Sequence, residues 1–381
     1  MTRVFVGMSG GVDSSLTAAL LVEQGYDVTG VYMKNWTQDM PGLKCPWAED
    51  LADAKRVAVH LGIDFEVFDF QQEYKQKVVD YMIQEYRSGR TPNPDIMCNQ
   101  EVKFRLFLDM ALERGADMIA TGHYARVDNG LLTTELSETA SRPTSLEYAS
   151  GSDGAAEVSE SSSSNARLLL AKDNNKDQTY FLYRVTGEAL SKTLFPLGEY
   201  TKPEVRKMAK ERGLTTASKP DSQGICFVGQ IGIRDFLSEY VEQEPGAIID
   251  KQSGERVGTH DGAIFYTLGQ RHGLDVGGGL PYYVVGKDMD KNEVYVSRNL
   301  SDESLWRKEV KLDSIHWINP DFPFPNPETP LQIRIRHRAP LVTANLSGDT
   351  LHLGESQRAV TAGQSIVMYR DGVCLGGGIV C

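Results

Sequence analysis

The sequence contains no apolar run that approaches the roughly 20 residues required by a membrane-spanning helix. Its first residues pass directly into an apolar segment from Arg3 to Gly7, so we expect no signal or transit peptide. Basic residues are in deficit, because 40 Lys and Arg stand against 52 Asp and Glu and give a net charge of −12. We therefore expect a cytoplasmic protein without a membrane partner, in which any contact with nucleic acid depends on a local basic patch.

Cysteine is scarce, and its spacing excludes the common cysteine-based sites. The five cysteines form an odd set that does not suggest a disulfide framework. No Cys-x-x-Cys pair is present to hold zinc or an iron–sulfur cluster, so we expect no structural metal centre. Isolated cysteines are usually small core residues, and local context must decide which of them is reactive. They are Cys45, Cys98, Cys226, Cys374 and Cys381.

Residues 1–215 are expected to form a domain built on a parallel sheet. Between Arg3 and Thr121, short apolar segments alternate with amphipathic segments that end at glycine, as in strands joined by helices. Such sheets are covered by helices on both faces and bind ligands at the carboxyl ends of their strands. That edge receives the segments after Val6, at Met33 and at Gly122.

The stretch from about Thr133 to Asn165 has the composition of a disordered insertion. Ser, Thr, Glu, Gly and Ala dominate it, and they bury too little apolar area to offset the entropy of ordering. Strand-like segments flank it at Tyr124–Val127 and Leu168–Ala171, so we expect the insertion to extend a hairpin. It holds no cluster of aromatic or basic residues. We therefore expect a passive loop whose deletion preserves function.

The rest of the chain is expected to be rich in β-structure. Glycine becomes frequent from about Gly246, and short apolar segments such as Ala263–Tyr266 and Tyr282–Val285 are typical of strands. After about Leu305 the pattern consists of short strands separated by turn residues, which is typical of a small closed barrel. We therefore predict an α/β domain followed by a small central domain at 216–300 and a C-terminal β-barrel at 301–381.

A glycine-rich loop, Ser9-Gly10-Gly11-Val12-Asp13-Ser14-Ser15, follows the first expected strand and opens the first expected helix. Adjacent glycines let backbone N–H groups surround an anion, and the helix dipole and serine hydroxyls add to the attraction. No Lys follows the glycines, so this is not the Gly-x-x-x-x-Gly-Lys-Ser/Thr loop, nor is it the dinucleotide fingerprint. The strand–loop–helix context favours a phosphate site over an ordinary glycine turn.

The heptad resembles the loop of the ATP-pyrophosphatase superfamily. That resemblance implies cleavage of ATP between its α and β phosphates, adenylation of a substrate oxygen and displacement of AMP by a nucleophile. It also implies that Met33 and Gly122 line the adenine side of the pocket. The complete set of expected ATP contacts is Gly7, Met8, Ser9, Gly10, Gly11, Val12, Asp13, Ser14, Met33 and Gly122.

Two of the cysteines lie in segments that suit a reactive thiol. Cys98 follows Asn93-Pro94-Asp95, and we expect a helix to begin just beyond it, near Val102, where the helix N-terminus lowers the pKa of a thiol. Cys226 lies beside a glycine in an expected loop. Each cysteine taken alone would more often be structural, so the surrounding motifs must decide.

Several segments, in this order, resemble those of the tRNA-specific 2-thiouridylases. The match covers essentially the whole chain apart from the Ser-rich insertion. The segments are Gly7-Met8-Ser9-Gly10-Gly11-Val12-Asp13-Ser14, Met33-Lys34-Asn35-Trp36, Asn93-Pro94-Asp95 with Cys98-Asn99, Lys176-Asp177-Gln178-Thr179-Tyr180-Phe181, Gly224-Ile225-Cys226-Phe227 and Thr267-Leu268-Gly269-Gln270-Arg271.

The resemblance implies ATP-dependent 2-thiolation of the wobble uridine at position 34 of tRNA. ATP with Mg²⁺ would adenylate the C2 oxygen of the base, and Cys226 would carry the incoming sulfur as a persulfide. Cys98 would complete the transfer while a Cys98–Cys226 disulfide forms, giving 2-thiouridine, AMP and pyrophosphate. Asp95 would assist proton transfer or hold the base, although a simple turn residue after proline is the alternative.

The same resemblance names the partners. We expect tRNA acceptors for Lys, Glu and Gln, and a sulfur donor that is either a cysteine desulfurase or a sulfur relay protein. A base inside an anticodon must be splayed out and held by stacking and by contacts to its edge. The segment from Arg334 to Arg338 would place alternate basic side chains on one face of a strand to bind phosphates, unless it is only a solvated edge. The expected RNA contacts are Asn93, Pro94, Asp95, His123, Lys176, Asp177, Gln178, Arg336, His337 and Gln364.

Two other functions are compatible with the loop alone. One is an amidotransferase-like or argininosuccinate-type ligase that adenylates a small molecule and needs neither Cys98 nor Cys226. The other is a non-catalytic RNA-binding protein that retains the loop without using it. Loss of activity on changing either cysteine to serine excludes the first, and release of AMP and pyrophosphate in the presence of tRNA excludes the second.

Overall fold

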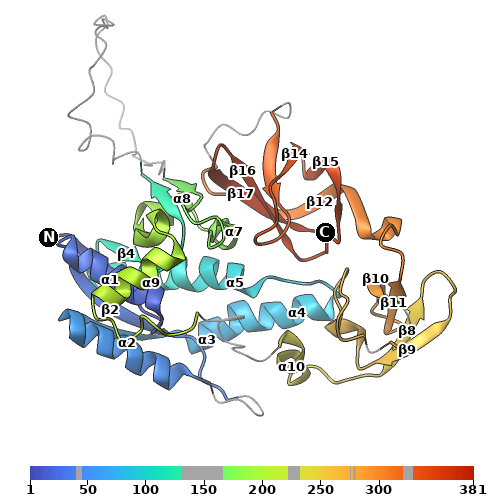
Figure 1. The fold of residues 1–381 in the computed structure, drawn as a ribbon, viewed down its shortest axis with the longest axis horizontal. Coiled ribbons are helices and arrows are strands. Elements are labelled where there is room, and N and C mark those ends of the chain that lie inside the picture. Colours follow the sequence, from blue (N-terminus) through green and yellow to red (C-terminus); the bar gives the residue numbers. More distant parts are fainter. Residues whose placement is uncertain (40–44, 130–165, 222–231, 275, 278–279, 321–328) are drawn as a thin grey trace, which may run out of the picture.

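An open parallel sheet forms the centre of the amino-terminal part of the chain (Figure 1). The computed structural model describes residues 1–39, 45–129, 166–221, 232–274, 276–277, 280–320 and 329–381. The sheet has five strands in the order β3-β2-β1-β4-β7, all parallel, which confirms the predicted fold class. The strands are β1 (Arg3–Gly7), β2 (Asp27–Lys34), β3 (Asp64–Asp69), β4 (Met118–Ala120) and β7 (Thr193–Leu194).

Helices cover both faces of this sheet because its strand residues are apolar on both sides. Val4 and Val6 of β1 are buried against one group of helices, whereas Phe5 between them is buried against the other. The first group comprises α1 (Val12–Glu23), α2 (Trp47–Leu61) and α9 (Lys202–Glu211). The second group consists of two long composite helices over residues 71–87 and 94–113.

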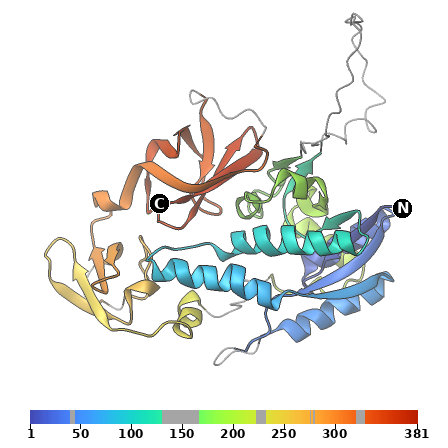
Figure 2. The same cartoon turned by 180° about the vertical axis from the view of Figure 1, so that it is seen from behind.

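Each composite helix contains a π-helical segment between two α-helical ends. Figures 1 and 2 show the two helices lying side by side between the parallel sheet and the small sheet of the central region. The second helix begins at Pro94 rather than near Val102, so the predicted start is wrong. Asn93 caps it by accepting hydrogen bonds from the backbone of Asp95 and Ile96, and proline is tolerated in the first turn. The parts are α3 (Gln71–Tyr74), Lys75–Asp80, α4 (Tyr81–Arg87), α5 (Pro94–Met97), Cys98–Leu106 and α6 (Phe107–Glu113).

The predicted hairpin is present and joins the amino-terminal part to the barrel. Strands β5 (Arg126–Asp128) and β6 (Arg167–Leu169) pair antiparallel, and β6 also pairs with the last strand of the chain. The insertion predicted at 133–165 lies outside the described residues. The short helices that follow are α7 (Thr179–Leu182), α8 (Gly187–Ser191), a 3-10 turn (Pro196–Glu199) and, after α9, α10 (Ile233–Ser238).

A small mixed sheet forms the central region, with strand order β10-β11-β8-β9. The segment Ala263–Phe265, predicted as a strand, is instead a 3-10 turn. All three of its side chains are buried, and a short run of buried apolar residues does not distinguish a strand from a turn. The strands are β8 (Gly246–Asp250), β9 (Arg256–His260), β10 (Tyr283–Asp288) and β11 (Glu293–Ser297).

The last part of the chain is a closed antiparallel barrel, as predicted. Its strand order is β12-β15-β14-β13-β16-β17, and β12 closes the barrel by pairing with both β15 and β17. The long strand β12 makes this possible because its two halves pair with different neighbours. The strands are β12 (Trp306–Trp317), β13 (Leu331–Arg334), β14 (Val342–Ser347), β15 (Thr350–Arg358), β16 (Ser365–Arg370) and β17 (Val373–Val380). Within the described segments, no helix is long and apolar enough to cross a bilayer.

Candidate active site

The glycine-rich loop lies between β1 and the N-terminus of α1, and its own serines hold it in shape. The Ser14 hydroxyl accepts a hydrogen bond from the Ser9 backbone at 3.1 Å and donates one to the Gly11 carbonyl at 3.2 Å. Gly10 has a φ of +74°, and a Cβ there would lie 2.3 Å from the Asp50 carbonyl oxygen of α2. The loop is therefore preformed, with the N-terminus of a twelve-residue helix available to an anion.

Gly122, predicted to line the adenine side, lies against this loop, and Met33, predicted with it, lies beside Gly7 at the end of β1. A Cβ on Gly122 would approach the Ser14 backbone nitrogen to 2.8 Å, so glycine allows the turn after β4 to pack on the loop. A Cβ on Gly7 would lie 2.9 Å from the Met33 methyl group. The carboxyl ends of three neighbouring strands thus converge, as expected for a parallel sheet.

Replacing Gly122 by alanine is expected to raise the KM for ATP by about tenfold or more, since a displacement of about 1 Å near a site costs up to about 100-fold. The added Cβ would meet backbone atoms of Asp13 and Ser14, which cannot move without changing the loop. Gly232→Ala is the matched control, because the nearest atom to its Cβ is 3.8 Å away. Equal KM values for the two variants in a pyrophosphate-release assay would contradict the expectation.

A network of ion pairs, not anticipated from the sequence, surrounds Asp13 of the loop. Lys202 donates to both carboxylate oxygens of Asp13 at 2.7 and 2.8 Å, and its Nζ lies 2.8 Å from an oxygen of Asp221. Lys176 and Arg206 also donate to Asp221, each at 2.6 Å. Burial alone would raise the pKa of Asp221, but hydrogen bonds from Lys176 and Lys202 outweigh it and hold the pKa at about 2. Three cations therefore gather beside the phosphate loop.

The family resemblance also implies Mg²⁺ with ATP, and Asp13 and Asp221 have carboxylates that suit such a cation. Both carboxylates contact the same ammonium group, so one cation already bridges them. Mg²⁺ in nucleotide sites is typically held by one or two carboxylates together with phosphate oxygens and water. Across the described ranges, no group of three or more His, Cys, Asp and Glu side chains could hold a metal alone. The donor set therefore fits a metal that arrives with a polyphosphate.

The segment that leads toward Cys226 is fixed beside the loop. Lys219 binds Asp50 at 2.7 Å and Asp53 at 2.6 Å, and Arg206 donates to the Ala217 carbonyl at 3.0 Å. The described part of this segment ends at Asp221. Cys226 itself lies outside the described residues.

Cys98 is buried in the second turn of the helix that begins at Pro94. Its neighbour Asn99 is also buried and donates to the Phe181 carbonyl at 3.0 Å, which fixes α7 against this helix. Asp95 lies one turn before Cys98, and burial raises the pKa of its carboxyl group although Lys103 opposes the shift. A carboxyl group with a raised pKa suits proton transfer near neutral pH.

All three parts of the chain meet at Thr91, just before the Asn93-Pro94-Asp95 segment. The Thr91 backbone donates to the Ala362 carbonyl of the barrel at 2.8 Å, and its hydroxyl lies 3.2 Å from that of Thr267 in the central region. A Cβ on Gly363 would lie 2.8 Å from the Thr91 nitrogen. Gln364, which follows Gly363, is therefore brought beside the segment that leads to Cys98.

The segment Lys176-Asp177-Gln178 serves mainly to hold the protein together. Asp177 is entirely buried, and its carboxylate accepts hydrogen bonds from the Ala171 backbone, the Thr179 hydroxyl and Arg334. Gln178 accepts from the Tyr124 backbone at 2.8 Å through its side chain. In this conformation the Asp177 carboxylate has no surface available to RNA, whereas Lys176 is partly exposed.

The expected basic stripe from Arg334 to Arg338 is wrong, because the strand ends at Arg334. Arg334 is buried in its pair with Asp177, and Arg338 adopts a left-handed φ of +63° in the turn that follows. Arg336 donates to the Arg358 carbonyl at 2.8 Å and is exposed. The segment from Arg334 to Arg338 is therefore not a strand with its basic side chains alternating on one face.

His123 and His337, the two histidines expected to contact RNA, are packed against aromatic rings. Burial lowers the pKa of His123 well below its usual range, and the ring lies 5.6 Å from Phe104 and 6.0 Å from Phe195. Burial and the neighbouring Arg338 lower the pKa of His337 to about 4, and its ring lies 4.5 Å from Phe181. His337 thus packs on α7, which Asn99 holds against the Cys98 helix.

Comparisons with known proteins fix the family. The chain is 42% identical to the tRNA-specific 2-thiouridylase MnmA of Bacillus subtilis over 385 residues, covering 100% of this chain and 95% of that protein. The chain belongs to the tRNA-specific 2-thiouridylases. The MnmA protein of Bacillus cytotoxicus is 43% identical over 100% of this chain and 94% of its own length.

Family models match three successive parts of the chain. They are described as a tRNA methyl transferase HUP domain at 2–230, a tRNA methyl transferase PRC-barrel domain at 234–298 and an aminomethyltransferase beta-barrel domain at 307–380. Among solved structures, a 4-thiouridine synthetase–RNA complex with bound ATP covers 63% of this chain and 50% of its own, at 16% identity and a TM-score of 0.36. The family assignment rests on the sequence relatives.

The structure brings the predicted residues together in two groups. It also adds residues that the sequence did not indicate. The loop, Met33 and Gly122 form one group, and Thr91 joins the segments of Asn93 and Gln364 in a second. The residues that the sequence did not single out are Tyr124, Lys202, Arg206 and Lys219, each bonded to an aspartate near the loop or to a carbonyl before residue 222. No spacing signal identifies them, because their partners lie far away in sequence.

Proposed function

We propose that this protein catalyses ATP-dependent 2-thiolation of the wobble uridine of tRNA. The observation that carries the proposal is the combination of a preformed phosphate loop with the buried Cys98 helix in a chain 42% identical to MnmA over its full length. We assign residues 1–215 to adenylation, and 216–300 and 301–381 to the central and barrel domains. We also propose that the reaction takes place in the cytoplasm.

The activation half belongs to the loop and its cations. Gly10, Gly11 and the N-terminus of α1 would bind the ATP phosphates, while Lys202 and Arg206 would neutralise the pyrophosphate that leaves. Mg²⁺, held by Asp13 and Asp221, would supply further charge neutralisation there. Adenylation of O2 matters because the uracil carbonyl is a poor electrophile until its oxygen becomes a leaving group.

The sulfur half uses the two cysteines. The terminal sulfur of a Cys226 persulfide attacks C2 of the adenylated uridine, and the bond between C2 and the AMP oxygen breaks. The Cys98 thiolate then attacks the Cys226 sulfur, so the persulfide S–S bond breaks and its outer sulfur remains on C2. The resulting Cys98–Cys226 disulfide must be reduced by an external thiol before the next cycle, and the donor protein restores the persulfide.

The base would be held beside Cys98 by the segment Asn93-Pro94-Asp95. A carboxyl group of raised pKa at Asp95 suits proton exchange with the uracil during activation. Neutral His337 on Phe181 and the exposed Arg336 would contact the anticodon arm, together with Lys176 and Gln364. His123 supports this site from within the core.

The test is reconstitution with ATP, unmodified tRNA transcripts for Lys, Glu and Gln, and a persulfide-charged cysteine desulfurase. We expect mass spectrometry of digested nucleosides to detect 2-thiouridine, with AMP and pyrophosphate formed in equal amounts. Pyrophosphate release that is independent of tRNA would instead support a small-molecule ligase. Binding of tRNA without pyrophosphate release would support the non-catalytic alternative.

A further inference from the structure

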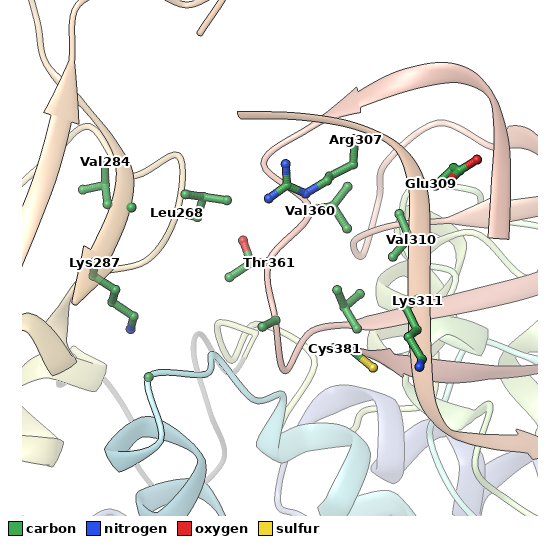
Figure 3. Close-up of a pocket in the computed structure, with 14 residues that line it drawn as sticks. Leu268, Val284, Lys287, Arg307, Glu309, Val310, Lys311, Val360, Thr361 and Cys381 are labelled. Carbon is green, nitrogen blue, oxygen red and sulfur yellow. The ribbon is translucent and has the colours of Figure 1, made fainter. Parts of the chain in front are cut away.

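A pocket of about 260 Å³ lies where the three parts of the chain meet (Figure 3). Leu268 and Lys287 of the central region line one side, and Arg307 and Thr361 of the barrel line the other. Gly89, from the loop after the first composite helix, completes the wall. Because none of these segments is adjacent in sequence, the pocket depends on the arrangement of all three parts.

The charged side chains of this pocket are mostly cationic. Lys287, Arg307 and Lys311 line it together with a single acidic side chain, Glu309. The Glu309 carboxylate lies 3.2 Å from a ring nitrogen of His352 and points away from the space between Leu268 and Val360, into which Arg307 extends. Across the described ranges, neither Arg307 nor Lys287 forms an ion pair. Lys311 pairs with Asp349 at 3.4 Å, so the unbalanced positive charge of the pocket comes from Lys287 and Arg307.

Lys287 is the most buried of these three cations. It is half-buried, and its ammonium donates one hydrogen bond, to the Tyr266 carbonyl at 2.9 Å. Burial lowers the pKa of Lys287 to about 8, so the group is still mostly charged at neutral pH. An ammonium group removed from water without a counterion is costly, and an anion in the pocket would supply the missing partner.

We propose that this pocket binds a phosphate group. Its volume exceeds that of a single phosphate, and its cations come from both the central sheet and the barrel, so a bound phosphate would link the two. The wall residue Ala362 also binds the Thr91 backbone, which precedes Asn93 and Asp95 by a few residues. The position therefore favours a backbone phosphate of RNA bound at the neighbouring site, and a free phosphate-bearing molecule is the other source of the same chemistry.

The first experiment measures binding of inorganic pyrophosphate to the full chain by calorimetry, with a non-hydrolysable ATP analogue filling the phosphate loop. Lys287→Met and Arg307→Gln are each expected to weaken binding about tenfold or more, the range found when a charged hydrogen-bond donor is lost. Lys308→Gln is the matched control, since it removes the same charge from the same strand outside the pocket. Thermal unfolding of each variant establishes that it is folded, and Arg307 is exposed and tolerates substitution.

The second experiment separates the two sources and, for its RNA arm, rests on the proposed function. A weaker affinity for tRNA in both variants, with a salt dependence reduced by about one unit of slope, identifies an RNA phosphate. Unchanged tRNA affinity with lost pyrophosphate binding identifies a free anion, and that result stands even if the chain does not thiolate tRNA. If pyrophosphate and tRNA bind both variants as tightly as the Lys308→Gln control, the proposal is overturned.

Discussion

Replacing Cys98 by serine is expected to lower the rate of 2-thiouridine formation by about a thousandfold or more, while tRNA-dependent pyrophosphate release continues. The contacts that hold the glycine-rich loop, Met33 and Gly122 in place come from residues other than Cys98, so the expected adenylation step should not need the thiol. Sulfur release does need it, because a serine hydroxyl is not ionised at neutral pH and cannot break the persulfide bond. The measurement is nucleoside mass spectrometry paired with a pyrophosphate assay on the same reaction.

Cys45→Ser provides the matched control for this experiment. Cys45 is half-buried and its thiol donates to the Trp36 carbonyl at 3.8 Å, so serine retains a donor of similar size there. Thiolation by this variant should equal that of the unmodified chain. If Cys98→Ser kept more than a tenth of the thiolation rate, the thiol-transfer step would be refuted. The adenylating loop would then belong to a ligase that needs no cysteine.

The conformation of the glycine-rich loop was predictable from the sequence because its determinants are local. Gly10 needs a left-handed φ, Ser14 bonds within the loop, and the strand and helix that flank it are contiguous in the chain. The closed barrel and the parallel sheet were also predictable, since apolar periodicity and turn residues recur over many consecutive residues. These local signals do not depend on how distant segments of the chain pack together.

The cation network around Asp13 could not be predicted, because it joins segments that are far apart in the sequence. Lys202 and Asp13 are separated by 189 positions, and Arg206 and Lys219 carry no motif. The start of the Cys98 helix was misplaced for a different reason. Proline usually interrupts a helix, but Pro94 occupies the first turn of this helix and Asn93 caps it. Cys98 therefore lies deeper in the helix than an N-terminal thiol.

The basic segment shows how pattern alone fails at a domain junction. Alternation from Arg334 to Arg338 predicted one charged face, yet Arg334 turns inward because Asp177 offers a buried carboxylate. A buried arginine requires such a partner, and the partner comes from the amino-terminal part of the chain. Arg334, which the pattern placed in an RNA-binding stripe, is therefore a link between the barrel and the amino-terminal part of the chain.

This link leads to the second large effect. Replacing Asp177 by its amide (Asp177→Asn), or Arg334 by the neutral glutamine (Arg334→Gln), is expected to lower the free energy of unfolding by about 3–5 kcal/mol, because each leaves one charge buried without its partner. The pair is 2.8 Å apart, and its side chains are 0% and 10% exposed. The measurement is chemical unfolding monitored at the barrel, since a protein of three parts need not unfold in one step.

The double variant distinguishes an ion pair from mere packing. Removing both charges should recover part of the loss, giving a coupling energy of about 1–3 kcal/mol in a double-mutant cycle. Lys207→Gln is the surface control, because its pair with Glu211 is exposed and 3.8 Å long, and it should leave stability unchanged within error. Additive effects of the two single substitutions would show that the pair itself contributes nothing.

The same variants should affect RNA more than ATP. Arg334 precedes the turn that carries Arg336 and His337, and Asp177 adjoins Lys176, whose ammonium binds Asp221 near the loop. Loosening the pair therefore moves the turn of the barrel directly, whereas Asp13 and Lys202 retain their own contacts. At a temperature where both variants are folded, the KM for tRNA should rise several-fold more than the KM for ATP. An equal rise in both KM values would mean that Asp177 and Arg334 support the fold as a whole and do not position the turn that carries Arg336 and His337.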